Sequence, residues 1–301
     1  MVPLVIQSMQ YWLSEHPKMV TFRWNTQLWG STWLFLLTSI SFYITAAVTL
    51  HHLLLPLFLR RRSRPVPLGP IPALHSLAMT LISAAIFAGT LSSVAAEIRD
   101  TRWLWQRSKT PFQWLLCFPL GTRSSGRVFF WSYVFYLSRF LLPLRTFFVI
   151  LRRRTLPHIQ LFYDSIFICM SFLWLEFSQS FQVFTILCVS LMYSMVFGYG
   201  FWAELGFPGP TYPGIVIHCQ MFLLGCNLVF HVGAILLHFF KGGCNGIGVG
   251  FVNFVLNAVT FFMFFKFYVK MHLPIRMDVT SKPKSSSETK DEFANGKDKD
   301  D

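Results

Sequence analysis

Two stretches of this sequence place polar and titratable side chains along one face of an otherwise apolar helix. At 100° per residue, the members of each stretch fall within an arc of about 40°. They are Gln160, Asp164, Ser171 and Ser178 in the first stretch, and Gln220, Asn227, His231 and His238 in the second. Carboxylates and imidazoles in such rows can position or transfer protons. The pattern predicts two polar seams that face one shared interior cavity. The alternative is that these groups only hydrogen-bond between helices.

Two arginines and a tyrosine lie in the same apolar part of the chain. Arg139 and Arg145 precede the first stretch, and Tyr163 lies within it. An ionisable group at membrane depth costs about 2.5–3.5 kcal/mol unless it faces the protein interior, so we expect the two arginines to face inward. A guanidinium binds carboxylate or phosphate groups, and a tyrosine hydroxyl can donate a proton. These residues are therefore candidates for the binding and chemistry of an anionic substrate.

The remaining histidines and the cysteines match no motif of metal or thiol chemistry. Neither H-E-x-x-H nor H-x-x-H is present, so no metal site is predicted. The six cysteines contain no C-x-x-C pair, and four of them lie inside apolar stretches. This pattern supports neither a disulfide framework nor a zinc site. The glycines from Gly242 to Gly250 do not match a nucleotide-binding loop, and we expect a tight turn there.

The composition identifies the class of protein that must position these side chains. Of the 301 residues, 53% are hydrophobic and 13% are charged, and that charged share is about half of the usual one. A soluble domain needs a charged exterior, so the composition excludes an ordinary cytosolic enzyme and a globally disordered chain. The formal net charge of +13 lies largely in short basic runs between apolar segments. Such runs are typical of membrane topology signals, and no nucleic-acid partner is predicted.

Seven segments are long and apolar enough to cross a bilayer, which takes about 20 residues. We therefore expect an all-α membrane protein whose seven transmembrane helices form a bundle. The predicted helices cover residues 31–57, 71–96, 128–151, 157–177, 180–202, 213–240 and 247–269. The membrane domain is predicted at 31–275, after a lumenal or interfacial N-terminal segment at 1–30 and before a disordered cytosolic tail at 276–301. No cleaved signal peptide is predicted.

The positions of basic residues predict the orientation of the bundle. Three basic groups fall on the cytosolic side if the N-terminus is lumenal and the C-terminus is cytosolic. These groups are Arg60–Arg64, Arg152–Arg154, and Lys266 with Lys270. The basic loop at 97–127 falls on the other side and is predicted to be a partly buried interfacial segment. The tail ends with Lys297 and Lys299, a spacing similar to the dilysine retrieval signal of the endoplasmic reticulum.

The order of these segments resembles the ELO family of very-long-chain fatty acid elongases, especially its plant branch, over about residues 10–275. The resemblance rests on short runs in the same order, namely Tyr136-Leu-Ser-Arg-Phe, Arg152–Arg154, Leu173-Trp174-Leu175 with Ser178-Gln179-Ser180, Phe197-Gly198-Tyr199, and Cys219-Gln220. It implies condensation of malonyl-CoA with a long-chain acyl-CoA to a 3-oxoacyl-CoA in a bundle that encloses an acyl tunnel. It also implies no bound cofactor, and the reductases and dehydratase of elongation as partners.

The sequence departs from this family at the family's most characteristic polar positions. The histidine box H-x-x-H-H falls on Gln160, Leu161, Phe162, Tyr163 and Asp164. The run K-x-x-E-x-x-D-T falls on Arg139, Leu142, Arg145 and Thr146. A histidine of the fifth helix falls on Tyr193. The guanidinium of Arg145 thus replaces a carboxylate, and that of Arg139 replaces a lysine, near a box that has lost its imidazoles. We expect Arg139 or Arg145 to form an ion pair with Asp164, because an unpaired buried charge is costly.

The residues and the resemblance together predict a site and leave three functions open. The predicted catalytic residues are His231, His238, Asp164, Tyr163 and Gln220, and the predicted substrate-binding residues are Arg139, Arg145, Gln160, Asn227 and Gln179. The first function is a condensing acyltransferase with a remodelled site. The second is an inactive homologue that acts as a scaffold or regulator of the elongase complex. The third is a lipid-binding or transport protein, which the sequence favours least because it shows no paired inverted repeats.

Overall fold

The structure is a computed structural model, and it describes residues 8, 10–54, 68–105, 117–153, 156–207 and 212–272. The long helices are α3 (Trp33–Thr49), α5 (Ile71–Trp105), α7 (Arg127–Arg139), α8 (Pro143–Arg153), α9 (His158–Glu176), α10 (Gln182–Glu204), α11 (Tyr212–Lys241) and α12 (Ile247–His272). Two short helices, η1 (Tyr11–Glu15) and α2 (Pro17–Val20), precede them, and a π-helical turn, η2 (Leu50–Leu54), extends α3.

Within the described residues, seven stretches are long and apolar enough to cross a membrane. They are Trp33–Leu53, Ile71–Asp100, Arg127–Arg152, His158–Glu176, Gln182–Glu204, His218–Phe240 and Ile247–Lys266. The predicted all-α protein with seven membrane-spanning segments is thereby confirmed. The predicted tail at 276–301, which includes Lys297 and Lys299, and the basic run Arg60–Arg64 lie outside the described residues.

The third span is predicted as one helix, 128–151, but consists of two helices in the structure. α7 ends at Arg139, and α8 begins at Pro143. Proline lacks a backbone N–H and clashes with the preceding turn, so it begins a helix more readily than it continues one. The break places Arg139 and Arg145 on different helices, which lets their side chains take different directions.

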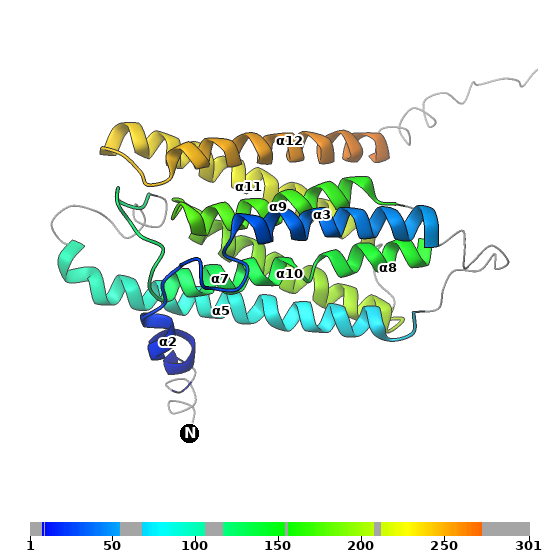
Figure 1. Ribbon diagram of the computed structural model, residues 1–301, viewed down its shortest axis with the longest axis horizontal. Helices are drawn as coiled ribbons and strands as arrows, with labels where there is room; N and C mark the ends of the chain where they lie inside the picture. Colours follow the sequence, from blue (N-terminus) through cyan, green and yellow to red (C-terminus); the bar gives the residue numbers. More distant parts are fainter. Residues whose placement is uncertain are drawn as a thin grey trace, which may run out of the picture. The chain divides into compact units, whose positions relative to one another are not determined.

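Residues 1–264 and residues 265–301 form two compact units, and the second is described only over 265–272, the last turns of α12. Within the first unit, the long helices run lengthwise beside one another (Figure 1). α5 packs along α10, α7 contacts α5 and α9, α3 contacts α8 and α9, and α11 contacts α10. The contact between α5 and α7 needs a glycine, because a Cβ atom at Gly89 of α5 would lie 2.1 Å from the Trp131 ring of α7.

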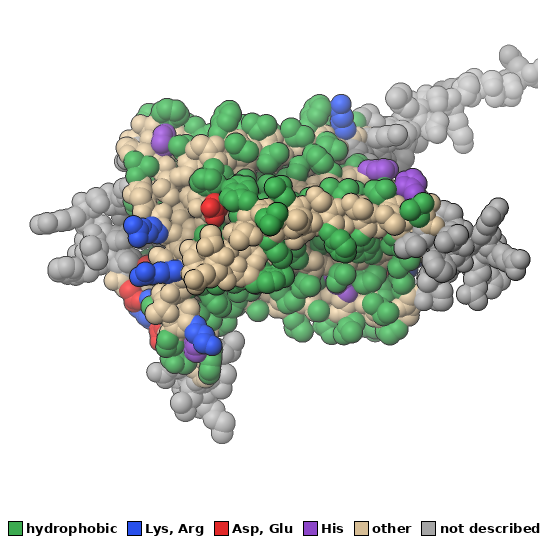
Figure 2. Space-filling view, in the orientation of Figure 1, with side chains coloured by type: hydrophobic (Ala, Val, Ile, Leu, Met, Phe, Trp, Pro, Cys, Tyr) green, Lys and Arg blue, Asp and Glu red, His purple; other side chains and the backbone are tan. Residues whose placement is uncertain are grey.

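The face of the molecule in Figure 2 carries many exposed hydrophobic side chains along the helices. Exposed large hydrophobic side chains include Leu34, Phe42, Phe222, Val229 and Phe251. Ion pairs lie towards the ends of the bundle, where Arg99 pairs with Glu15 at 3.2 Å and Arg152 pairs with Glu204 at 2.7 Å. α5 continues to Trp105, past its predicted end at residue 96, because such pairs accommodate its charged last turns. Apolar flanks between charged ends suit a bilayer.

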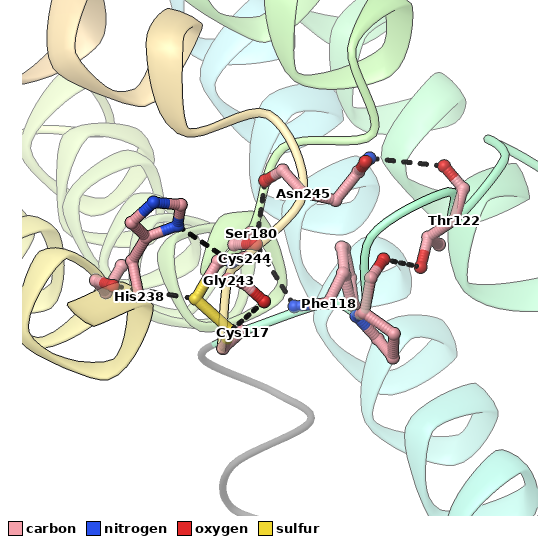
Figure 3. Close-up of a disulfide and its surroundings, with 10 residues drawn as sticks. Cys117, Phe118, Thr122, Ser180, His238, Gly243, Cys244 and Asn245 are labelled. Carbon is pink, nitrogen blue, oxygen red and sulfur yellow. Dashed lines mark hydrogen bonds between the residues drawn. A yellow bond between two sulfur atoms is a disulfide. The ribbon is translucent and has the colours of Figure 1, made fainter. Parts of the chain in front are cut away.

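A disulfide between Cys117 and Cys244 joins the segment before α7 to the α11–α12 turn (Figure 3). Their Cα atoms are 5.0 Å apart, as is usual for a disulfide. The expectation of no disulfide framework is therefore wrong for this pair, because cysteines so distant in sequence meet only through the fold. The predicted tight turn is confirmed, with positive φ angles at Gly242 and Gly243. We term this end of the bundle the disulfide end and the other the opposite end.

Asn245 ties the segments of the disulfide end together (Figure 3). Its Nδ2 donates to the Thr122 carbonyl at 3.2 Å, and its carbonyl accepts a hydrogen bond from Ser180 Oγ at 2.9 Å. Ser180 Oγ in turn accepts from the backbone N–H of Phe118 at 3.0 Å. Phe118 is fully buried, so the basic loop is anchored in the bundle at this residue, whereas residues 119–121 are exposed. Its residues 106–116 lie outside the described ranges.

Candidate active site

Asp164 is buried in the first half of α9, and neutral donors from three helices surround it. Gln160 lies one turn earlier on the same face, and its Nε2 donates to Asp164 Oδ1 at 2.7 Å. Asp164 Oδ2 lies 3.1 Å from Tyr43 Oη of α3 and 3.2 Å from Thr146 Oγ1 of α8. The two hydroxyl oxygens are 3.0 Å apart. These four residues form what we term the Asp164 network, in which both carboxylate oxygens are hydrogen-bonded.

The predicted ion pair between an arginine and Asp164 is wrong. Over the described ranges, neither Arg139 nor Arg145 forms an ion pair with this carboxylate. The reason is that three neutral donors already occupy both of its oxygens. Arg145 is partly buried, and its guanidinium lies 5.9 Å from the centre of the Phe197 ring.

Arg139 is fully buried among aromatic rings at the end of α7. Its guanidinium carbon lies 4.1 Å from the centre of the Phe135 ring and 4.9 Å from that of Tyr193, distances at which the ring faces attract a cation. Nε and Nη2 donate to Ser138 Oγ at 3.2 and 2.8 Å. Nη1 has no hydrogen-bond partner among the described residues. Arg139 therefore retains donor capacity in the interior of the bundle.

Tyr163 of α9 and Tyr193 of α10 meet beside this arginine. Their hydroxyl oxygens lie 3.2 Å apart, and both residues are buried. The Tyr163 ring stacks on Phe167, with ring centres 5.6 Å apart. In the resemblance stated above, both tyrosines occupy positions at which family members have histidine. Two phenol groups thus meet where imidazoles are expected, and with Arg139 they form what we term the Arg139 cluster.

The polar row on α11 faces α10 and α12. Asn227 Oδ1 accepts a hydrogen bond from Thr185 Oγ1 of α10 at 3.0 Å, and Asn227 Nδ2 donates to Asn257 Oδ1 of α12 at 3.3 Å. One turn further on, His231 Nδ1 lies 2.8 Å from the Asn227 carbonyl. The row therefore joins three helices at the side of the bundle away from the partners of Asp164.

The prediction that the rows on α9 and α11 face one shared cavity is wrong. A pocket of about 10 Å³ lies between α9, α10, α11 and α12, and its lining includes Tyr163, Asn227 and Asn257. Asp164 bonds instead to Tyr43 of α3 and Thr146 of α8, and Gln160 bonds to Asp164. α9 thus has two polar faces, because adjacent residues on a helix point about 100° apart. We term the pocket between α9, α10, α11 and α12 the central pocket.

Three further predicted residues, namely His231, Gln179 and His238, lie closer to the disulfide end. His231 and Gln179 line a second pocket of about 10 Å³ between the α9–α10 turn, α11 and α12. His238 Nδ1 accepts the backbone N–H of Cys244 at 2.9 Å (Figure 3), so it stabilises the turn. Gln220 is buried near the start of α11, and its Oε1 has no partner within the described part of the chain. The structure therefore brings together Asp164 and Gln160, but it does not bring the α11 histidines to them.

Several buried polar residues were not predicted from the sequence as members of the site. Asn253, Asn257 and Thr260 of α12 share one face by the same arithmetic that identified the α11 row, so this signal was available. Asn253 Nδ2 donates a short hydrogen bond to Gln179 Oε1. Tyr43 carried no such signal, because it is the only titratable residue of α3, and its partner Asp164 is distant in sequence.

Comparisons with known proteins agree with the architecture. Residues 28–280 match the model of the GNS1/SUR4 family. The chain is 59% identical over 278 residues to a fatty acid elongase 3-like protein of Arabidopsis thaliana, a match that covers 91% of this chain and 96% of that protein. It is 24% identical over 238 residues to a putative fatty acid elongase of Dictyostelium discoideum, over 77% of this chain and 73% of that one. No solved structure matches the chain.

Proposed function

The chain belongs to the GNS1/SUR4 family, and from this membership we propose that it is an acyltransferase of fatty acid elongation. The proposed reaction condenses malonyl-CoA with a long-chain acyl-CoA to give a 3-oxoacyl-CoA, free CoA and carbon dioxide. Both CoA thioesters are substrates, and no bound cofactor takes part. The observation that carries the proposal is the Arg139 cluster, a buried cation beside two joined phenol hydroxyls, with one donor that has no partner within the described ranges.

Decarboxylation supplies the nucleophile of this reaction. Loss of carbon dioxide from malonyl-CoA leaves the enolate of acetyl-CoA, whose carbon attacks the carbonyl of the acyl thioester. A carbon–carbon bond forms, and the carbon–sulfur bond of the long-chain acyl thioester breaks. The CoA thiolate that is released takes up one proton from water. Because the enolate arises by decarboxylation, no base has to remove a proton from carbon. The site must instead stabilise negative charge on the enolate and carbonyl oxygens.

The Arg139 cluster has the groups for that task. A guanidinium keeps its charge in a protein interior, and Nη1 of Arg139 is available to an oxyanion. Tyr163 and Tyr193 share one hydrogen bond, so one of their two hydroxyl protons remains to donate to a substrate oxygen. The Asp164 network acts as a positioning element, since it fixes α9 against α3 and α8. This arrangement supports condensation without the imidazoles of the family box.

The test is an activity assay on purified protein in lipid vesicles. We expect release of labelled carbon dioxide from malonyl-CoA only when a long-chain acyl-CoA is present. Arg139→Gln should lower kcat by about a hundredfold, the usual cost of removing one oxyanion donor. Arg99→Gln, which alters an exposed arginine near the disulfide end, should change kcat less than about twofold, because exposed ion pairs contribute little. Absence of product for every chain length would reject the enzyme.

A different observation favours the second function, a catalytically inactive scaffold or regulator of the elongase complex. Tyr163 and Tyr193 bond to each other, and both oxygens of Asp164 are bonded within the protein, as expected where polar groups serve packing. The partners of such a protein would be the elongase reductases and dehydratase. It would yield no product alone, yet would raise product formation in membranes that contain an active elongase.

We place the proposed activity in the endoplasmic reticulum membrane, with the N-terminus lumenal and the C-terminus cytosolic. Disulfides form in oxidising compartments, so the Cys117–Cys244 bond supports a lumenal position for the disulfide end. The basic residues predict the same side for these two loops. In sealed microsomes, protease should remove the tail at 276–301 and leave the peptide containing Cys117 intact. Loss of that peptide without detergent would overturn the orientation.

A further inference from the structure

The second pocket, between the α9–α10 turn, α11 and α12, is narrow and walled by glycines. Its volume is about 10 Å³, about the space of one water-sized group. A Cβ atom at Gly246 would lie 2.9 Å from the Phe177 carbonyl oxygen, and one at Gly250 would lie 3.3 Å from Gln179 Nε2. Larger residues at these two positions would close the pocket. The space therefore depends on the absence of two side chains.

Two buried polar side chains that line this pocket, His231 and Gln179, have complementary hydrogen-bonding capacity. His231 Nδ1 lies 2.8 Å from the Asn227 carbonyl, which can only accept, so Nδ1 carries the proton and Nε2 of the neutral ring is an acceptor. Gln179 Oε1 accepts from Asn253, which leaves Gln179 Nε2 as a donor. Both Nε2 atoms are buried without a partner among the described residues. Each of the two side chains is 1% exposed.

One acceptor and one donor together fit a hydroxyl group. A hydroxyl donates its proton to His231 Nε2 and accepts a hydrogen bond from Gln179 Nε2 through a lone pair. A methyl group does neither, and it would leave both atoms unpaired in a buried site, which is costly. A cation is disfavoured because the amide presents its donor, and a carboxylate is disfavoured because the imidazole presents its acceptor.

The pocket lies in line with the Arg139 cluster along the bundle. Tyr163 and Asn227 both line the central pocket, and His231 lies one turn beyond Asn227 on α11. The stretch of α9 from Tyr163 to its end at Glu176 spans about 20 Å at 1.5 Å per residue. That span is about two-thirds of the hydrocarbon thickness of a bilayer, so an extended acyl chain that followed α9 from a thioester at the cluster would end near this pocket.

The geometry points to this pocket as a binding site for a hydroxyl group at the far end of the acyl chain. The protein then prefers ω-hydroxyacyl-CoA to an unsubstituted acyl-CoA of the same length. This inference rests on the proposed function, because it takes the thioester to lie at the Arg139 cluster. It adds a specificity determinant formed by His231 and Gln179, which lies apart from the groups assigned to the chemistry.

The experiment compares ω-hydroxypalmitoyl-CoA with palmitoyl-CoA in equilibrium binding to the purified full-length protein in lipid nanodiscs. The hydroxylated chain should bind about tenfold more tightly, the scale of one well-matched buried polar group. Gln179→Leu removes the donor and should bring the ratio of the two Kd values close to one. Gln182→Leu is the matched control, because Gln182 is also fully buried but does not line the pocket, and it should retain the ratio.

A pair of glycine variants tests the same site without removing a polar group. Gly250→Ala adds a methyl group against Gln179 Nε2 and should abolish the preference. Gly248→Ala on the same helix has open space around the new Cβ atom and should preserve it. Equal binding of both ligands, with no effect of Gly250→Ala, would mean that the pocket holds a water molecule only. That result overturns the inference but leaves acyl-CoA binding intact, whereas binding of neither ligand defeats the proposed function itself.

Discussion

The Asp164 network and the pocket of His231 and Gln179 are both buried in the bundle, yet they differ in how fully their polar atoms are paired. Both oxygens of Asp164 accept hydrogen bonds, from residues on three helices. In the pocket, one nitrogen of His231 and one of Gln179 have no partner in the described part of the chain. A paired buried group stabilises the fold, and an unpaired one lowers stability. The comparison assigns stability to the first region and ligand recognition to the second.

The largest expected effect comes from removing the centre of the network. Asp164→Leu leaves Gln160 and Thr146 without this acceptor, although Tyr43 can still donate to Thr146, and we expect it to lower the free energy of unfolding by about 3 kcal/mol. Asp164→Asn keeps one acceptor oxygen and should cost about 1 kcal/mol. Denaturant unfolding in detergent micelles measures both values. If Asp164→Leu proved as stable as the unaltered protein, the first half of the comparison would not stand.

The contents of the network show how far sequence reasoning reaches. Helical periodicity placed Gln160 and Asp164 on one face, and apolar length defined the seven spans, because both are properties of one segment. Which neighbour that face meets depends on the rotation of α9 about its axis, and that is set by packing with α3 and α8. The partner of Asp164 was therefore predicted as an arginine and found to be Tyr43 and Thr146.

The same limit applies to the candidate site near the disulfide end. His231 and Asn227 were predicted from the sequence as polar residues at membrane depth and Gln179 as a substrate-binding residue, yet their grouping into two pockets depends on tertiary contacts. The bond between Cys117 and Cys244 spans 127 residues, and no local spacing indicates it. The polar face of α12 is different, because the helical spacing of Asn253, Asn257 and Thr260 in the sequence already indicates it.

A smaller effect is expected at Asn227, which is hydrogen-bonded like the Asp164 network but also lines a pocket. Its side chain bonds to Thr185 and Asn257, but it also lines the central pocket. Asn227→Leu should lower the free energy of unfolding by about 1 kcal/mol, since interhelical hydrogen bonds in membranes contribute about 0.6 kcal/mol each. Denaturant unfolding of this variant beside Asp164→Leu gives the ranking. A cost equal to that of Asp164→Leu would remove the contrast between a carboxylate and a neutral network.

The smallest effect is expected within the pocket itself, at His231. His231→Phe loses the hydrogen bond to the Asn227 carbonyl, but it also removes a buried acceptor that has no partner among the residues that the structure describes. The new ring can keep the contacts to Phe181 and Phe254, whose ring centres lie 4.2 and 5.8 Å from that of the imidazole. Loss and gain should nearly cancel, so the free energy of unfolding should change by less than about 0.5 kcal/mol. Unfolding of His231→Phe and Asp164→Leu under identical conditions tests this directly. A loss at His231 as large as that at Asp164 would mean that the imidazole is held for stability, and that its open nitrogen serves no ligand.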